Sequence, residues 1–256
     1  MKGSIIKYSL ISVAAVFLLL VIWQIAASII NLPLILPSPP MAVGQITILV
    51  RSIDFWHHLW ATLSRGLFGF GISLVVGVIL GFMAGKYTWI EAFLRPLIIF
   101  VRSTPSMSLI LLALIWFKGD TVPVFVNFLM VFPMIIQNII EGIKNIDREL
   151  LEMVNIYRVK QWRQLTTLYF PSLLPYLAAG IAAGLGVTWK VLIAAEVLAY
   201  PAWGIGTQMD TARVYLQTDK VFAWTIVVMV IGIFFDYLLD YLLRRPFSAW
   251  KGTDHA

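Results

Sequence analysis

Apolar residues occur in long runs along this chain, and short connections that carry most of the charge separate them. Six runs have the length that a helix needs to cross a hydrocarbon core of roughly 30 Å, about 20 residues. They cover residues 9–30, 64–85, 94–117, 121–141, 172–199 and 221–243. The pattern predicts an all-α polytopic membrane protein with six transmembrane helices in a single domain, residues 1–256.

The first run follows Lys2 and Lys7, as the apolar region of a signal peptide does. Ser9–Ile30 is long enough to span a membrane and lacks a clean small-residue cleavage site, so we predict a retained span. Three prolines within Leu36–Pro40 then exclude helix and predict an extended turn. Residues 41–55 show apolar residues at helical spacing, and we expect a helix that lies in the external interface.

The polar connection 147–171 joins the fourth and fifth spans and is the longest one assigned to the cytoplasmic side. Asp147 is a suitable N-cap, and Glu149 places a negative charge in the first turn of a helix. Apolar residues follow at helical spacing with a change of phase near Arg158, which predicts two short amphipathic helices. Pro171 is expected to end the second helix. On this pattern alone, a loop resting on lipid headgroups explains the segment equally well.

Composition agrees with a membrane protein, because hydrophobic residues make up 60% of the chain and charged residues only 12%, with a mean hydropathy of +0.88. The net charge of +6 needs no nucleic-acid partner if topology explains it. With both termini cytoplasmic, the cytoplasmic segments hold twelve Lys and Arg residues and the external segments five. Since cytoplasmic loops carry the excess of positive charge, we predict cytoplasmic N- and C-termini.

Several kinds of chemistry are excluded by what the sequence lacks. It contains no cysteine, which excludes disulfides, iron–sulfur sites and thiol nucleophiles. It contains no Gly-x-x-x-x-Gly-Lys-Ser/Thr phosphate-binding loop, so we expect no nucleotide site of that kind in this chain. His57 and His58 are adjacent and cannot face one ligand from a helix, so a surface or interfacial role is expected for them instead of a metal site.

Three ionisable residues, Arg102, Lys190 and Glu196, fall inside predicted spans. A charge at the bilayer centre costs about 2.5–3.5 kcal/mol or more, so each should face protein or water. Pro105 adds a break in the helix beside Arg102, and a broken helix there would line a cavity. Structural pairing of Arg102 or Lys190 with Glu196 or with backbone carbonyls is the alternative. The candidate residues of a solute pathway are Arg102, Ser103, Thr104, Pro105, Lys190 and Glu196.

Small residues recur at helical spacing in two spans, at Gly77, Gly81 and Gly85 and again at Gly180 and Gly184. Such rows let helix backbones approach closely in lipid, where helix association depends on packing. They predict either close packing within one subunit or a seam between two copies.

The segment 147–171 resembles the signature loop of the permeases of binding-protein-dependent ABC importers, whose pattern is Glu-Ala-Ala, three residues, Gly, and a Leu-Pro ending. Glu152 takes the Glu position, Arg158 the Gly position and Pro171 the final Pro, at matching spacing. Arg158 departs from the family glycine, which permits a left-handed turn. The resemblance implies a coupling helix in a groove of the ATPase. The implied contact residues are Glu152, Tyr157, Arg158, Lys160, Trp162, Arg163, Leu165 and Pro171.

Further pieces are similar to the branch of this type I, MetI-like family that serves nitrate, taurine, aliphatic sulfonates, bicarbonate and pyrimidine precursors. They are Leu36–Pro39, Thr62–Arg65, Gly69-Phe70, Arg102–Pro105, Trp116-Phe117, Gly142–Asp147, Ala194–Glu196, Gly204–Gly206 and Thr218–Phe222. The resemblance divides the single domain into an N-terminal span and interfacial segment, residues 1–60, and a core, residues 61–245.

As a member of this family, the chain is expected in the bacterial cytoplasmic (inner) membrane. The resemblance implies a homodimer in membrane lipid with two partners, a cytoplasmic ATPase dimer and an extracytoplasmic substrate-binding protein. ATP and Mg would bind the ATPase, and no cofactor is expected in this chain. The solute would be small and anionic or organic. Its identity is not implied.

An ion-coupled secondary transporter is the alternative function. Asp236, Asp240 and Glu196 would then form a proton relay. This alternative leaves the signature loop without an explanation.

Overall fold

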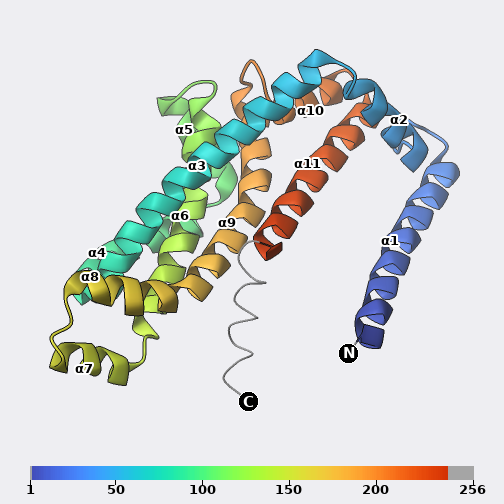
Figure 1. Cartoon of the computed structure of the whole chain (residues 1–256). Coiled ribbons are helices and arrows are strands. Elements are labelled where there is room, and N and C mark those ends of the chain that lie inside the picture. Colours follow the sequence, from blue (N-terminus) through green and yellow to red (C-terminus); the bar gives the residue numbers. More distant parts are fainter. Residues whose placement is uncertain (1, 242–256) are drawn as a thin grey trace.

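The computed structural model describes residues 2–241, which form a bundle of helices (Figure 1). No strand occurs among them. The helices are α1 (Lys2–Ile30), α2 (Pro39–Leu49), α3 (Ile53–Lys86), α4 (Thr88–Ser103), α5 (Ser106–Trp116), α6 (Thr121–Lys144), α7 (Arg148–Ile156), α8 (Gln161–Gln164), the π-helical turn η1 (Leu165–Tyr169), α9 (Phe170–Ala199), α10 (Ile205–Val214) and α11 (Thr218–Leu239). Five helices are long and apolar enough to cross a membrane, and α4 with α5 makes a sixth if the pair is one span. The predicted fold class is confirmed.

Helix α6 lies at the centre of the bundle, between α3 and α9 (Figure 1). A Cβ atom at Gly77, Gly81 or Gly85 of α3 would lie within 2.8 Å of an isoleucine side chain of α6. A Cβ atom at Gly184 of α9 would lie 2.9 Å from Val131 of α6. Both glycine rows therefore serve packing within the subunit, the first of the two predicted alternatives.

The predicted third span is broken at Pro105. Helix α4 ends at Ser103 and α5 begins at Ser106, with a bend of 103° between them. Thr104 has φ −80° and ψ 128°, the extended conformation that a following proline favours. The break expected from the sequence is thus present, and α4 begins earlier than predicted, at Thr88.

The second span is longer than predicted, because α3 starts at Ile53 and has 34 residues. The interfacial helix predicted for residues 41–55 runs from Pro39 to Leu49 instead. The prediction that the prolines of Leu36–Pro40 exclude helix is therefore wrong for Pro39 and Pro40, because proline is tolerated in the first turn of a helix. Ser52 begins the new helix, since its side chain accepts a hydrogen bond from Phe55 N at 3.3 Å. At 1.5 Å per residue α3 is roughly 51 Å long, which exceeds the hydrocarbon core. The first turns of α3 therefore contribute polar residues to the bundle. The predicted span, residues 64–85, did not include them.

The connection between α6 and α9 contains the two predicted helical pieces. Asp147 caps α7, accepting a hydrogen bond from Glu149 N at 2.9 Å. Arg158 has φ +49°, so it adopts the left-handed conformation that the family's glycine would permit. Pro171 does not end a helix, which corrects the prediction. The helical path continues from Gln161 to Ala199. The π-helical turn η1 widens the helix just before Pro171. A regular α-helix there would bring the proline ring against the carbonyl group four residues earlier.

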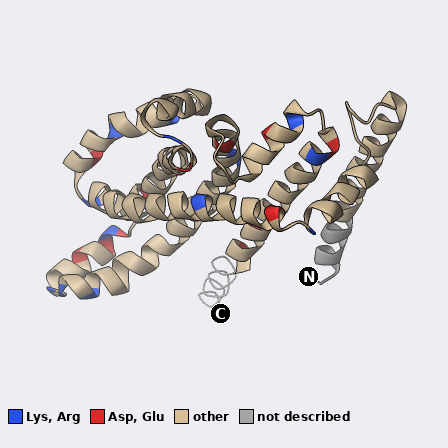
Figure 2. Cartoon of the chain, turned by 90° about the horizontal axis from the view of Figure 1, so that it is seen from above, with Lys and Arg blue, Asp and Glu red and all other residues tan. Residues whose placement is uncertain are grey.

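Helix α1 stands beside the bundle (Figure 1). Trp23 stacks on Phe222 of α11 with ring centroids 5.4 Å apart and donates a hydrogen bond to Pro37 O at 2.9 Å. The first turns of α1 lie at the same end of the molecule as α7 and α8 (Figure 1). Long stretches of helix carry few charges (Figure 2). The cytoplasmic location of the termini stays a prediction, and the last predicted span, 221–243, extends beyond the described residues.

Candidate functional site

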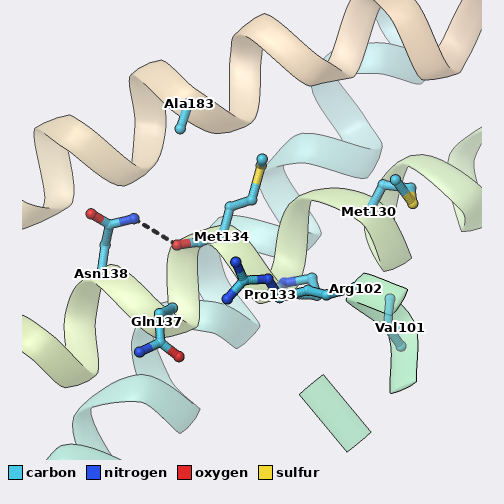
Figure 3. Close-up of a pocket in the computed structure, with 8 residues that line it drawn as sticks. All are labelled: Val101, Arg102, Met130, Pro133, Met134, Gln137, Asn138 and Ala183. Atoms are coloured by element: carbon cyan, nitrogen blue, oxygen red, sulfur yellow. Dashed lines mark hydrogen bonds between the residues drawn. The ribbon is translucent and has the colours of Figure 1, made fainter. Parts of the chain in front are cut away.

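A cavity of about 320 Å³ lies where the end of α4 meets the middle of α6 and α9 (Figure 3). Its lining residues come from these three helices. They are Val101, Arg102, Met130, Pro133, Met134, Gln137, Asn138 and Ala183. Arg102 is the one charged residue in this lining. This central cavity thus combines one cation, two amides and an apolar wall that contains two methionines.

Arg102 lies in the last turn of α4, immediately before the break. Within residues 2–241 its guanidinium makes no hydrogen bond or ion pair. Gln137 and Asn138 face the same cavity from α6, and Asn138 Nδ2 donates to Met134 O at 2.8 Å (Figure 3). Pro133 lies inside α6, where it leaves a backbone carbonyl of the preceding turn without its usual donor.

The other residues of the predicted break have different positions. Thr104 Oγ1 donates to Phe100 O at 2.7 Å within its own segment. The central cavity is not lined by Ser103, Thr104 or Pro105. These residues form the break at which the chain turns from α4 into α5. Gln137, Asn138 and Pro133 were missed by the sequence analysis. Two adjacent amides and a proline inside an apolar span were the available signal.

Glu196 belongs to a different cluster, at the end of the bundle near α10. Its carboxylate is fully buried, and Oε1 lies 2.6 Å from Arg65 Nη1. Thr62 Oγ1 lies 2.9 Å from Oε2, and Gly206 N donates to the same oxygen at 2.9 Å. Arg65 also lies 2.6 Å from Asp120 through Nη2. Glu196 thus has a structural partner, as one alternative proposed, but that partner is Arg65 and not Arg102 or Lys190.

His58 belongs to this buried cluster too. Its Nδ1 accepts a hydrogen bond from Gly204 N at 2.9 Å, and its Nε2 lies 2.9 Å from Gln208 Nε2. The surface role expected for both histidines is therefore wrong for His58, which α3 carries into the bundle, whereas His57 is exposed. Among the described residues, no group of three His, Asp or Glu side chains is placed to hold a metal ion.

Lys190 is separated from Arg102 as well. With Asp236 and Trp189 it lines a second cavity, of about 430 Å³, between α9 and α11. No ion pair joins Lys190 to another described residue. The six predicted pathway residues therefore divide among the central cavity, the break beside it, the buried cluster and this lateral cavity.

Helix α7 presents an exposed tip. Val154 on its inner side packs with Ile146 and Leu168 in a small core. On the outer side Ile156 and Tyr157 are each 77% exposed. The remaining exposed residues of the tip include Met153 and the predicted contact residues Glu152 and Arg158. Met153 and Ile156 were not predicted as contact residues, although both are apolar residues that lie off the inner face.

The second half of the loop faces α3. Trp162 and Leu165 line an apolar groove together with side chains of α3, although Trp162 is still 74% exposed. Lys160 and Arg163 are exposed as well. Pro171 is only partly exposed at the start of α9. An anchoring role of Trp162 and Leu165 in the ATPase stays a prediction.

Comparison with known proteins identifies the family. Residues 74–248 match the model of the family described as binding-protein-dependent transport system inner membrane component. The chain is 35% identical over 256 residues to a putative aliphatic sulfonates transport permease of Escherichia coli strain K12, covering 98% of this chain and 96% of that protein. It is 31% identical over 238 residues to a riboflavin transport system permease of Chloroflexus aurantiacus, covering 92% and 88%.

A solved structure agrees in fold. A chain of a methionine ABC transporter in an inward-facing conformation superposes with a TM-score of 0.56 at 20% identity, over 80% of this chain and 97% of that chain. The family match supports a permease over the ion-coupled secondary transporter considered as the alternative. This chain belongs to the binding-protein-dependent inner membrane components and is the multi-pass permease subunit of an ABC importer.

Proposed function

We propose that this permease receives a small anionic or organic solute from an extracytoplasmic binding protein and releases it into the cytoplasm by alternating access. Two copies form the path, and ATP hydrolysis on a cytoplasmic ATPase dimer, which holds ATP and Mg, drives the change. The absence of a phosphate-binding loop from the sequence supports hydrolysis on a partner. The family description supports a role for a binding protein.

The observation that carries this proposal is the exposed apolar tip of α7. Ile156 and Tyr157 are held out by the Asp147 cap on one side and the left-handed turn at Arg158 on the other. An exposed apolar cluster ringed by charged residues is typical of a protein interaction site. We therefore assign the contact with the ATPase to this tip.

The inner side of α7 supplies a mechanical connection to the path. Val154 packs against Leu168, which belongs to η1, and η1 leads directly into α9. Ala183 of α9 lines the central cavity about four helical turns further on. Because α7, η1 and α9 are joined by packing and by a continuous helical path, movement of the tip is transmitted to the cavity wall.

The central cavity favours a solute with an anionic group. Arg102 offers a guanidinium without a partner among residues 2–241, and guanidinium groups bind oxyanions through two parallel hydrogen bonds. Gln137 and Asn138 add polar contacts, while Met130 and Met134 offer an adaptable apolar wall for an organic portion. The two relatives carry the names of different solutes, aliphatic sulfonates and riboflavin, so the class is inferred from the cavity.

The test uses the purified ATPase and permease in reconstituted vesicles. Ile156→Ser should reduce association with the ATPase at least about tenfold, as expected for an anchor at the centre of an interface. It should also remove the stimulation of ATP hydrolysis by the loaded binding protein. Glu152→Ala should lower that stimulation as well. Pull-down of the ATPase and the hydrolysis rate, with and without loaded binding protein, measure both effects.

Leu216→Ser is the matched control, because Leu216 is 68% exposed at the opposite end of the molecule, between α10 and α11. Its ATPase association should equal that of the wild type. Wild-type association in the Ile156→Ser variant would show that α7 is a loop resting on lipid headgroups and would remove the main support for the proposal.

A further inference from the structure

An apolar groove of about 630 Å³ runs along the outside of the bundle, between the last turns of α3 and the segment formed by α8, η1 and the start of α9. Its α3 wall is entirely apolar, and Thr166 on the other wall is its one small polar side chain. The lining residues are Val78, Ile79, Phe82, Met83, Trp162, Leu165, Thr166, Tyr169, Phe170 and Leu173. The groove is thus built for a hydrocarbon surface.

Basic residues stand at one end of both walls. Lys86 follows Phe82 and Met83 by four and three residues, so it shares their face of α3 and lies nearer the α7 end of the bundle. Arg163 precedes Thr166 by three residues on the opposite wall. Both side chains are exposed, and neither forms an ion pair within the described part of the chain.

Acidic residues near this end do not neutralise the two cations. Glu91, at the start of α4, is paired with Lys144. The stretch Lys160–Phe170 contains no Asp or Glu, and neither does Val78–Thr88. The groove therefore has an apolar body and a positively charged end.

We propose that this groove binds an anionic phospholipid of the inner leaflet, with an acyl chain against α3 and η1 and the phosphate at Lys86 and Arg163. Basic pockets between transmembrane helices on the cytoplasmic side are suited to anionic headgroups. The depth of the groove argues against a water-soluble occupant, since its α3 wall lies in the last two to three turns of a membrane span. A cytoplasmic ATPase does not reach that depth.

The lipid would act on α8 and η1, which connect the tip of α7 to α9. Trp162 and Leu165 lie between the exposed tip of α7 and the long helix α9. An acyl chain in the groove fills the space between these side chains and Ile79 or Met83 of α3. It thereby holds α8 against α3 and stiffens the connection through which the tip acts on α9. This inference goes beyond the proposed transport function and does not depend on the solute.

The experiment measures lipid binding directly, in the purified importer complex in phosphatidylcholine nanodiscs that contain a small fraction of phosphatidylglycerol with a photoreactive acyl chain. Labelling should map to α3 and to residues 162–173. The Lys86→Gln variant should lower the labelling about fivefold, which corresponds to the ~1 kcal/mol that one basic residue contributes near an anionic surface. The Ile79→Trp variant should lower it by filling the groove.

Two matched variants control for nonspecific effects. Arg95→Gln removes a positive charge from an exposed position of α4 outside the groove. Val75→Trp adds the same ring to α3 one turn earlier, where Val75 is 59% exposed and does not line the groove. Both should label as the wild type does. Equal loss in all four variants would overturn the proposal, and so would equal labelling by a phosphatidylcholine probe of the same design.

A protein occupant would also overturn it. Because the chain contains no cysteine, Met83→Cys introduces a unique thiol into the groove. Disulfide crosslinking of this variant to a second copy would show that the groove is an interface between permeases. Absence of that crosslink together with labelling by the phosphatidylglycerol probe supports the lipid.

Discussion

Arg65 is shared between two carboxylates of different exposure. It contacts the fully buried Glu196 at 2.6 Å and Asp120 at the same distance, although the side chain of Asp120 is 73% exposed. Removing one partner of a buried pair leaves an uncompensated charge, whereas an exposed pair contributes little. The two contacts of one guanidinium should therefore differ greatly in their effect on stability.

Substituting either member of the buried pair should be strongly destabilising. Arg65→Met leaves the Glu196 carboxylate buried without its counter-charge, at an expected cost of about 3–5 kcal/mol. Asp120→Asn removes the exposed contact and should change stability far less. The midpoint of thermal unfolding in detergent compares the two variants. Similar midpoints for both would mean that Glu196 does not depend on Arg65.

Arg102 should act on transport and not on assembly. Arg102→Gln removes a charge-assisted hydrogen bond to an anionic solute, worth about 1.5–3 kcal/mol, which corresponds to roughly a 10- to 100-fold rise in KM for uptake. Basal ATP hydrolysis and recovery of the complex should not change. Uptake of the solute held by the cognate binding protein is the measurement.

Lys190→Gln is the control for this prediction, since Lys190 lines a different cavity between α9 and α11. It should leave KM near the wild-type value. Loss of the complex in Arg102→Gln would instead show that Arg102 has a structural role.

Local chemistry at single residues could be predicted from the sequence, but distant pairing could not. The Asp147 cap depends on a few neighbouring residues, and it is present. The bond between Arg65 and Glu196 joins residues 131 positions apart. Arg65 lies at the start of the predicted span, and no local pattern in the sequence indicates that it pairs with Glu196.

At the scale of helices, the glycine row of α3 determines how closely α6 can approach. Positions along α3 differ sharply in the space they offer. A Cβ atom at Gly81 would lie 2.8 Å from the Cβ atom of Ile139 and 3.1 Å from the carbonyl oxygen of Ile136. A Cβ atom at Gly71, on the same helix, would meet nothing within 4 Å.

These two glycines provide a matched pair of substitutions. Gly81→Ala forces α3 and α6 apart and should destabilise the permease by about 1–3 kcal/mol, the usual cost of overpacking. Gly71→Ala should be neutral or slightly stabilising, because alanine favours helix over glycine. Thermal unfolding of the purified permease distinguishes them. Equal behaviour of the two variants would show that α3 and α6 are not closely packed in lipid.

Helix existence was predictable and helix boundaries were less so. Apolar length located each span, and the proline rule located the break between α4 and α5. The start of α3 was missed, because His57 and His58 are polar and resemble a connection. Only the structure shows that His58 is accommodated in a buried cluster. The continuation through Pro171 was missed because η1 widens the helix there, a feature for which the sequence carries no simple signal.

In the whole molecule, the exposed tip of α7 and the central cavity lie apart, and α9 connects them. Each chain carries one such tip. An ATPase dimer offers two equivalent sites, so two permeases are needed to engage it symmetrically.

We therefore expect a complex of two permeases and two ATPase subunits. Native mass spectrometry of the importer purified through a tag on the ATPase measures the stoichiometry. An active complex with one copy of each would contradict the expectation. As a control, the same purification from the Ile156→Ser variant should yield ATPase without bound permease.

The break at Pro105 also has an electrostatic consequence for Arg102. Helix α4 ends at Ser103, and Pro105 has no N–H to donate to Val101 O, so the negative end of the helix dipole lies in the turn that carries Arg102. Peptide groups thus provide part of the counter-charge that an acidic side chain would otherwise supply. A carboxylate in that place would occupy Arg102 permanently, whereas a dipole stabilises the cation and leaves its N–H groups available to the next anion.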